Sequence, residues 1–241
     1  MKSEIIGGVG LTHLTVYEQR RAPDGEFSGS PHVHALTDEA YYVIGGRGRA
    51  ELHDVEHGFR TVTLKPGDYM QFPPCVIHRI VSTGGLVILA VMGNAGLAEN
   101  GDARIYFGKA VDDDSDEYAR LAGLAKNGLT GALDRRDAAV RAYGMLITMW
   151  ESNREGYFAE LKRFVDKHLN GAMKYEAKFS QAITEGPFAW GKRSISRLSA
   201  LPKGEADLEG EFHRPGPDYS YGMCGILRPI MGLKPIAEVC G

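Results

Sequence analysis

Two histidines, His32 and His34, stand one residue apart in this sequence, and Glu39 and His78 follow them. If the segment is extended, His32 and His34 lie on the same face, because strand side chains alternate with period two. Their rings can then converge on one point, which a helix does not allow at that spacing. Three imidazole nitrogens and one carboxylate oxygen form a donor set suited to a divalent or redox-active transition metal.

This donor set predicts the chemistry of the site. It leaves two open positions on a six-coordinate metal, which can take water, dioxygen or a bidentate substrate. The same donors suit Fe, Mn, Ni, Co and Zn, so we expect one divalent transition metal per chain without choosing among them. We also assign Glu39 a catalytic role, because a carboxylate ligand has the basicity to accept a proton.

The elements that must position these residues are short strands separated by turns. Runs of strand length with β-branched or aromatic content occur at 11–18, 39–44, 49–53, 60–64, 69–72, 78–81 and 86–92. Turn-forming residues stand between them at 45–46, 65–68, 73–74 and 84–85.

The spacing of the residues adds a family resemblance. His32-x-His34-x4-Glu39-x6-Gly46 is followed by Gly67-Asp68-x4-Pro73-x4-His78. These two motifs resemble those of the cupins, and residues 10–108 as a whole resemble a cupin barrel, which is a double-sheet jelly roll. The resemblance implies that His32, His34, Glu39 and His78 are the metal ligands, inside the barrel on two adjacent hairpins. We therefore expect a mainly β protein with a cupin β-barrel over residues 1–110.

The sequence departs from the family pattern at three positions that carry no metal ligand. Glu26 and Cys75 stand where glycines are usual, and Ser82 replaces an asparagine. These changes affect the turns more than the site.

Asp38 is a rival to Glu39, since both fit the loose family spacing. Strand alternation puts the two carboxylates on opposite faces, so only one can bind. We choose Glu39, which is the residue type the family uses there.

Alternation also predicts which other side chains face the interior. Counting from Glu39 and from His78, these are Tyr41, Val43, Ile80 and Ser82. Tyr41 could hydrogen-bond a substrate and is our second candidate catalytic residue, although a strand tyrosine is more often core packing.

Several further residues near the site, or able to titrate, have weaker claims. Tyr69 and Gln71 precede the His78 turn and could line the mouth of the barrel. Cys75 could be redox-active, but a buried turn cysteine is the safer interpretation. The remaining histidines are given no functional role: His13 could reach the interior but is more simply half-buried, His53 and His57 look exposed, and His168 and His213 fall outside the barrel.

Residues 111–241 read as a helical extension and a C-terminal segment. The acidic run 111–117 can cap a helix starting near Tyr118, and helical spacing continues over 133–152, 157–174 and 175–184. Residues 204–241 are rich in Gly and Pro yet too apolar for a free tail. We expect this end to pack on the barrel or on a partner subunit, contributing one strand, either as a lid over the site or as a structural buttress.

The composition of the chain limits which partners and which cellular compartment we expect. The net charge of −3 and pI near 6.2 give no footprint for nucleic acid, and the sequence shows neither a secretory signal nor a membrane span. Three scattered cysteines suggest reduced thiols and a cytoplasmic protein. Residues 86–92 are apolar on both faces, so we expect either the helices or a second barrel to cover the outer face, and favour a homodimer.

The leading functional hypothesis is a metal-dependent cupin enzyme acting on a small organic substrate. A dioxygenase stands slightly ahead of an isomerase or lyase acting on a sugar or keto acid. The alternative is a non-catalytic cupin that binds a metal or a small molecule. An acid–base residue inside the barrel would separate these classes, and Tyr41, Gln71 and His13 are weak candidates for it.

Overall fold

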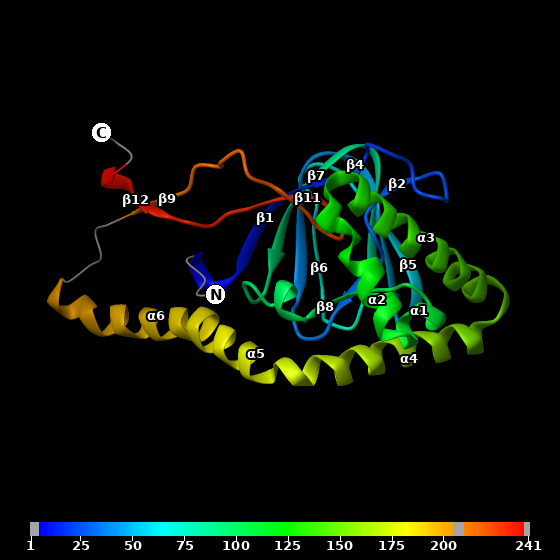
Figure 1. Cartoon of the computed structure of the whole chain (residues 1–241). Helices are drawn as coiled ribbons and strands as arrows, with labels where there is room; N and C mark the ends of the chain where they lie inside the picture. Colours follow the sequence, from blue (N-terminus) through cyan, green and yellow to red (C-terminus); the bar gives the residue numbers. More distant parts are fainter. Residues whose placement is uncertain (1–4, 205–209, 239–241) are drawn as a thin grey trace.

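A computed structural model describes residues 5–204 and 210–238 of the chain. Its centre is one antiparallel sheet built on two long strands, β4 (Glu39–Asp54) and β7 (Ile77–Met92), which pair along most of their lengths (Figure 1). The other strands from the first half of the chain are β1 (Gly10–Val16), β2 (Phe27–Ser28), β3 (His32–His34), β5 (Gly58–Leu64), β6 (Tyr69–Phe72) and β8 (Ala103–Ile105). The outer edge of β4 carries β5 and β6, and that of β7 carries β1, β2 and β3, with β8 beside β3.

The interior of the barrel is filled by alternate side chains of its strands. It contains the predicted interior residues Tyr41, Val43 and Ile80, together with Leu14 from β1 and Phe72 from β6. Each of these is at most 6% exposed. Alternation along the strands therefore predicted the inward face of β4 and β7 correctly near the metal-ligand residues.

The two Gly-Gly pairs were expected to end strands, and this expectation was wrong. β4 continues through Gly45 and Gly46, and β7 continues through Gly84 and Gly85, with irregular register between Val43 and Gly48. Gly46 has φ +73, and a Cβ there would lie 2.1 Å from the carbonyl oxygen of Gly85. The glycines thus permit a bulge and a close approach of two strands, and they bend the sheet without ending it.

Cys75 adopts a backbone conformation that favours glycine. It is the one described non-glycine residue with positive φ, at +66, and its N–H donates to the carbonyl oxygen of His34 at 2.8 Å. This is a position at which the sequence replaces a family glycine. The turn before His78 therefore keeps the glycine-like path at a cost in strain.

We expect Cys75→Gly to stabilise the protein by about 0.5–1 kcal/mol, because relief of left-handed strain outweighs the added entropy of the unfolded chain. Urea unfolding measures the change. Cys75→Ala keeps the Cβ and serves as the control; an equal gain in that variant would show that the thiol, and not the backbone, is the source.

The second half of the chain begins as a series of helices. Their bounds are α1 (Lys109–Asp113), α2 (Ser115–Ala122), α3 (Gly128–Ser152), α4 (Arg154–Ala172), α5 (Glu176–Ile183) and α6 (Ala189–Ala200). The acidic run caps α2 as expected, since the Asp114 carboxylate accepts from the N–H groups of Asp116 and Glu117. Helix α6 was not predicted, because the helical spacing of the sequence ends at residue 184, whereas the chain continues through Gly186 and Pro187 in a π-helical turn.

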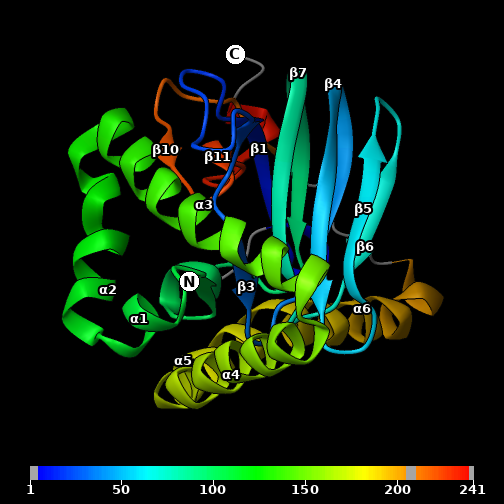
Figure 2. The same cartoon turned by 90° about the vertical axis from the view of Figure 1, so that its right-hand side faces the viewer.

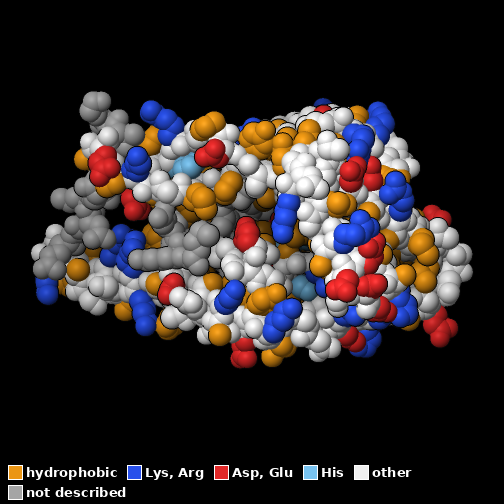
Figure 3. All heavy atoms as spheres, viewed as in Figure 1, with side chains coloured by type: hydrophobic (Ala, Val, Ile, Leu, Met, Phe, Trp, Pro, Cys, Tyr) orange, Lys and Arg blue, Asp and Glu red, His pale blue; other side chains and the backbone are white. Residues whose placement is uncertain are grey.

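Helices α3 and α4 cover one part of the outer face of the sheet, where α3 crosses the strands (Figure 2). Their contact with the barrel is a cluster of buried side chains, including Val33 and Ile77 from the strands and Tyr143, Tyr157 and Phe164 from the helices. Helix α5 packs through Phe179 and Ala182 against Leu97 and Ala35, and α6 extends beyond it (Figure 1). Acidic and basic side chains are interspersed over the helical end of the molecule (Figure 3).

His53 is buried beneath these helices, contrary to the expectation that it is exposed. Its ring is 1% exposed, with Nδ1 2.7 Å from the Tyr157 hydroxyl and Nε2 2.7 Å from the Tyr143 hydroxyl. Burial lowers the pKa of His53 to about 3. His57 is exposed, as predicted.

We expect the buried His53 to make stability fall on acidification. Its unfolded pKa is about 6.5, so below that pH the unfolded chain binds a proton that the folded protein does not take up. The stabilisation is complete above about pH 7 and declines by about 1 kcal/mol between pH 7.5 and 5.5. Urea unfolding of the native protein and of His53→Gln at both pH values isolates this contribution; parallel declines in the two proteins would contradict it.

The C-terminal segment returns to the barrel and joins its sheet. β11 (Gly225–Pro229) pairs with β1 over five residue pairs, and β10 (Ser220–Tyr221) pairs with β11. The segment thus contributes two strands to the barrel sheet, where one was expected. β9 (Glu211–Phe212) pairs with β12 (Lys234–Pro235) in a separate two-stranded antiparallel sheet.

The part of the outer face away from the helices stays partly open. Tyr42 and Ile44 on β4 and Tyr69 on β6 are all 46–60% exposed. A homodimer that covers this face remains a prediction. In the described part of the chain, none of the helices combines the length and the apolar character needed to cross a membrane.

Candidate metal centre

Three strands bring the four expected ligands together inside the barrel. His32 and His34 lie on β3, Glu39 begins β4, and His78 lies on β7, where it pairs directly with His32. One donor atom from each residue falls within 4.8 Å of all the others, and all four side chains are buried. Asp38, the rival carboxylate, lies just before β4 and is exposed to solvent.

The four donor atoms lie close together, although each is an atom that offers a lone pair to a metal. Nε2 of His32 and Nε2 of His78 are 3.0 Å apart. The Glu39 Oε2 atom is 3.0 Å from His78 Nε2 and 3.3 Å from His34 Nε2.

Each histidine is oriented through its other ring nitrogen. Nδ1 lies 2.9 Å from the Ser30 carbonyl oxygen in His32, 3.1 Å from the Val76 carbonyl oxygen in His78, and 2.9 Å from Asp102 Oδ2 in His34. Carbonyl and carboxylate oxygens only accept hydrogen bonds, so each Nδ1 carries the proton that it donates. With that single ring proton on Nδ1, the Nε2 atoms of His32 and His78 present lone pairs to the centre of the site.

Charge in the site also favours a cation. Burial raises the pKa of Glu39, but the neighbouring imidazole groups of His78 and His34 outweigh this effect and hold that pKa well below its usual range. Burial lowers the pKa of His34, but hydrogen bonds to Asp102 and Glu39 overcome this and raise it to about 9. Two carboxylates thus stabilise positive charge at the point where the donor atoms meet.

A divalent transition metal fits this arrangement. The buried Glu39 Oε2 atom has no hydrogen-bond partner of suitable geometry, and two imidazole lone pairs face each other across 3.0 Å. Both features are costly unless a positive ion lies between the groups. His32, His34, Glu39 and His78 would hold that ion, in keeping with the imidazole and carboxylate preference of such metals.

Asp102 is part of the site, although no sequence pattern predicted it. Its carboxylate accepts from His34 Nδ1 and from the N–H groups of Leu36 and Thr37 at 2.7 and 3.3 Å, and it is fully buried. His168, which was given no role, donates from Nε2 to the Asp102 carbonyl oxygen at 2.7 Å. No local pattern marks Asp102, because it meets His34 only through the pairing of β8 with β3.

We expect Asp102→Asn to weaken metal binding by roughly 10–100-fold, the usual cost of removing a carboxylate that orients a histidine ligand. Competition with a metal chelator measures this affinity. Asp38→Asn, an exposed neighbour of the site, is the matched control. Equal affinity in the two variants would mean that Asp102 does not support His34.

The other interior candidates divide between the site and the barrel wall. Tyr41 is fully buried, and its hydroxyl lies beside Glu39 and Cys224 but meets neither with good hydrogen-bond geometry. Burial, with help from the Glu39 charge, raises the pKa of Tyr41 well above its usual value. Ser82 is buried as expected, but its hydroxyl donates to Glu18.

The expectation that Tyr69 and Gln71 line the mouth was wrong. They pair with Tyr42 and Ala40 on β4 and so share the outward face of the sheet. Both side chains are exposed, and the Tyr69 hydroxyl donates to Gln71 Oε1 at 2.7 Å. The register of β6 on β4 decided this orientation, since a shift by one residue would reverse it.

Cys224 is the second residue of the site that the sequence analysis missed. It lies just before β11, is 7% exposed, and its Sγ is 3.6 Å from His32 Nε2. Burial raises the pKa of the Cys224 thiol. More than a hundred residues separate it from the motif histidines, so sequence spacing carried no signal.

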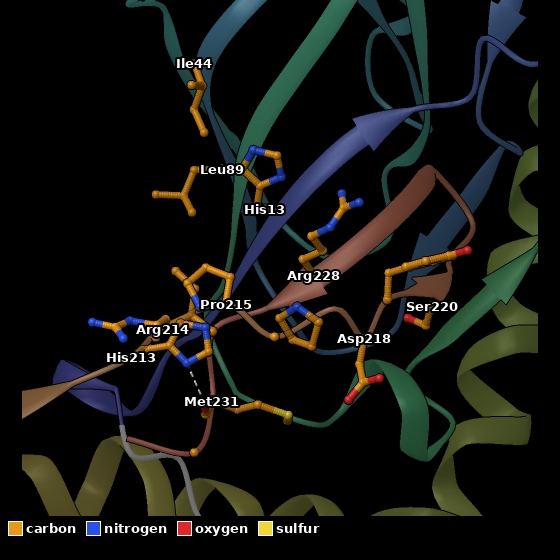
Figure 4. Close-up of a pocket in the computed structure, with 15 residues that line it drawn as sticks. His13, Ile44, Leu89, His213, Arg214, Pro215, Asp218, Ser220, Arg228 and Met231 are labelled. Atoms are coloured by element: carbon orange, nitrogen blue, oxygen red, sulfur yellow. Dashed lines mark hydrogen bonds between the residues drawn. The ribbon is translucent and has the colours of Figure 1, made fainter. Parts of the chain in front are cut away.

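A separate hollow lies on the outside of the barrel (Figure 4). It has a volume of about 970 Å³ and is formed between the sheet residues His13, Ile44 and Leu89 and the C-terminal segment around Arg214 and Arg228. None of the four metal-ligand candidates lines it. His13 faces this hollow, so it does not reach the barrel interior.

Comparison with known proteins supports the family interpretation. Residues 20–92, which include all four candidate ligands, match the family model for the cupin domain. A search of curated proteins gives no match.

Solved structures that resemble part of the chain include three from bacteria. A putative sugar phosphate isomerase from Acidithiobacillus ferrooxidans is 24% identical over 35% of this chain and 49% of its own, with a TM-score of 0.28. Lactobacillus farciminis oxalate decarboxylase is 21% identical over 36% of this chain and 24% of its own, with a TM-score of 0.31. The QdtA 3,4-ketoisomerase from Thermoanaerobacterium thermosaccharolyticum is 15% identical over 46% of this chain and 72% of its own, with a TM-score of 0.34. The match thus spans less than half the length of the first two proteins.

Proposed function

We propose that this protein is a metal-dependent cupin enzyme that uses dioxygen to oxidise a small organic molecule held at the metal. The observation that carries the proposal is the buried convergence of one donor atom each from His32, His34, Glu39 and His78 within 4.8 Å. A bound divalent transition metal would supply open coordination positions and, if it is iron, manganese or cobalt, redox chemistry.

The protein contributes orientation and a dry environment. Asp102 and the carbonyl oxygens of Ser30 and Val76 hold the imidazole rings, so that Nε2 of each histidine points to one centre. Glu39 is 5% exposed, so it supplies negative charge in a site of low dielectric. Such preorganised groups need no rearrangement when a substrate arrives.

The polar groups beside the donor set favour oxidation over isomerisation or elimination. The Tyr41 phenol and the Cys224 thiol approach the donors from the interior. The Asp102 carboxylate is already engaged by His34 and by backbone N–H groups. An isomerase or lyase needs a general base, most often a free imidazole or carboxylate. Glu39 could serve only by leaving the metal, whereas oxidation by dioxygen makes no such demand.

The experiment is oxygen uptake by the protein loaded with Fe(II), tested against catechols, thiols and diketones, with His78→Ala as the inactive control. We expect uptake with at least one class and none in the variant. Sugars and keto acids are tested in parallel for rearranged or cleaved products. Conversion of these without oxygen uptake would replace the proposal by an isomerase or lyase, and binding without any conversion would replace it by a non-catalytic binding protein.

A further inference from the structure

The C-terminal strand brings a thiol to the wall of the metal centre. Cys224 lies directly before β11, and its Sγ is 3.6 Å from the His32 nitrogen that faces the metal position. The thiol belongs to the same buried cluster as Tyr41 and Ile80. It therefore reaches the site from a part of the chain outside the residues that match the cupin model.

The position of Cys224 is built by specific contacts on both sides. The Ser30 N–H donates to the Met223 carbonyl oxygen at 2.8 Å, and the Tyr17 hydroxyl donates to the Gly222 carbonyl oxygen at 2.8 Å. A Cβ on Gly29 would lie 2.5 Å from the Cys224 Cα, so only glycine allows this approach without displacement. These contacts place the thiol at the site in a defined geometry.

Two polar atoms of the same site are buried without a hydrogen-bond partner. They are the Tyr41 hydroxyl and Glu39 Oε2, on side chains that are 0% and 5% exposed. A bound metal would account for the Glu39 oxygen. The Tyr41 hydroxyl, which lies beside both Glu39 and Cys224, still lacks an acceptor, and a buried unpaired donor of this kind calls for an explanation.

We propose that Tyr41 and Cys224 hold the small organic molecule at the open positions of the metal. This inference rests on the proposed function. The thiol is not itself a ligand, because the cluster of donor atoms lying within 4.8 Å of one another comprises the three histidines and Glu39 only. A phenol and a thiol both donate hydrogen bonds. The molecule that they hold therefore presents an acceptor oxygen to this corner, as a carbonyl, enolate or carboxylate does.

The test uses the full chain loaded with Co(II) and titrated with acetohydroxamate, a bidentate oxygen chelator, followed by the visible absorption of the cobalt. We expect Cys224→Ala and Tyr41→Phe each to keep the native cobalt content and to bind acetohydroxamate about 5-fold more weakly, a typical effect of one lost hydrogen bond. Cys224→Ser retains a donor and should stay within about twofold of the native protein. Cys75→Ser, a change at the thiol that does not belong to the cluster around Tyr41, is the matched control.

Native affinity in both Cys224→Ala and Tyr41→Phe would overturn the proposal. A sulfur-to-cobalt absorption band in the near ultraviolet, lost in Cys224→Ser, would also overturn it, because the thiol would then be a ligand. Failure of the native protein to bind Co(II) would instead remove the metal centre itself, together with the proposed function. The two failures are thus distinguished by the cobalt content of the native protein.

Discussion

His78→Ala should lose most of its bound metal, with affinity at least about 100-fold below that of the native protein. This estimate follows because loss of a group that merely orients a ligand costs roughly 10–100-fold, and His78 offers its Nε2 directly. His32→Ala and His34→Ala should behave alike, since all three nitrogens meet Glu39 or one another within 3.3 Å. Elemental analysis by mass spectrometry measures the metal per chain.

The two neighbouring carboxylates provide the control for this experiment. Glu39→Ala should weaken binding less than loss of a histidine, and Asp38→Ala should hardly change it, because Glu39 is buried with the donors and Asp38 is exposed. Circular dichroism of each variant establishes that the barrel is folded. Native metal content in His78→Ala, or a greater loss in Asp38→Ala than in Glu39→Ala, would show that the ligand set is wrongly assigned.

Ending the chain at Gly204 should abolish most of the soluble protein. The deletion removes β11 from the edge of β1 and takes Cys224 out of the core, where it packs with Leu14 and Tyr41. It also leaves Arg135, which donates to the Gly222 carbonyl oxygen, buried without that acceptor. The segment thus fits the structural buttress better than the lid, because a lid would leave the sheet and the core intact.

A second deletion separates the strand from the tail that follows it. A chain ending at Ile230 keeps β10 and β11 and loses β12, so we expect it to remain soluble and to bind metal. Expression yield and metal content are compared for the two deletions. Soluble, metal-loaded protein from the chain ending at Gly204 would restore the lid and remove the segment from the core.

The sequence by itself determined the features that depend on neighbouring residues. His32 and His34 share a face because strand geometry alone places them so, and the same alternation carried Tyr41 inward with Glu39. The Asp114 cap of α2 is equally local, since its carboxylate bonds to N–H groups two and three residues ahead. Such features need no knowledge of the fold beyond the element that contains them.

Only the tertiary structure decided the features that depend on distant pairing. The burial of His53 depends on helices about ninety residues away, and the outward direction of Gln71 depends on the register of β6. Asp102 and Cys224 reach the metal centre through the pairing of β8 with β3 and of β11 with β1. Strand pairing is not encoded by spacing along the chain, because it is selected by burial of whole faces of the sheet once the chain has closed on itself.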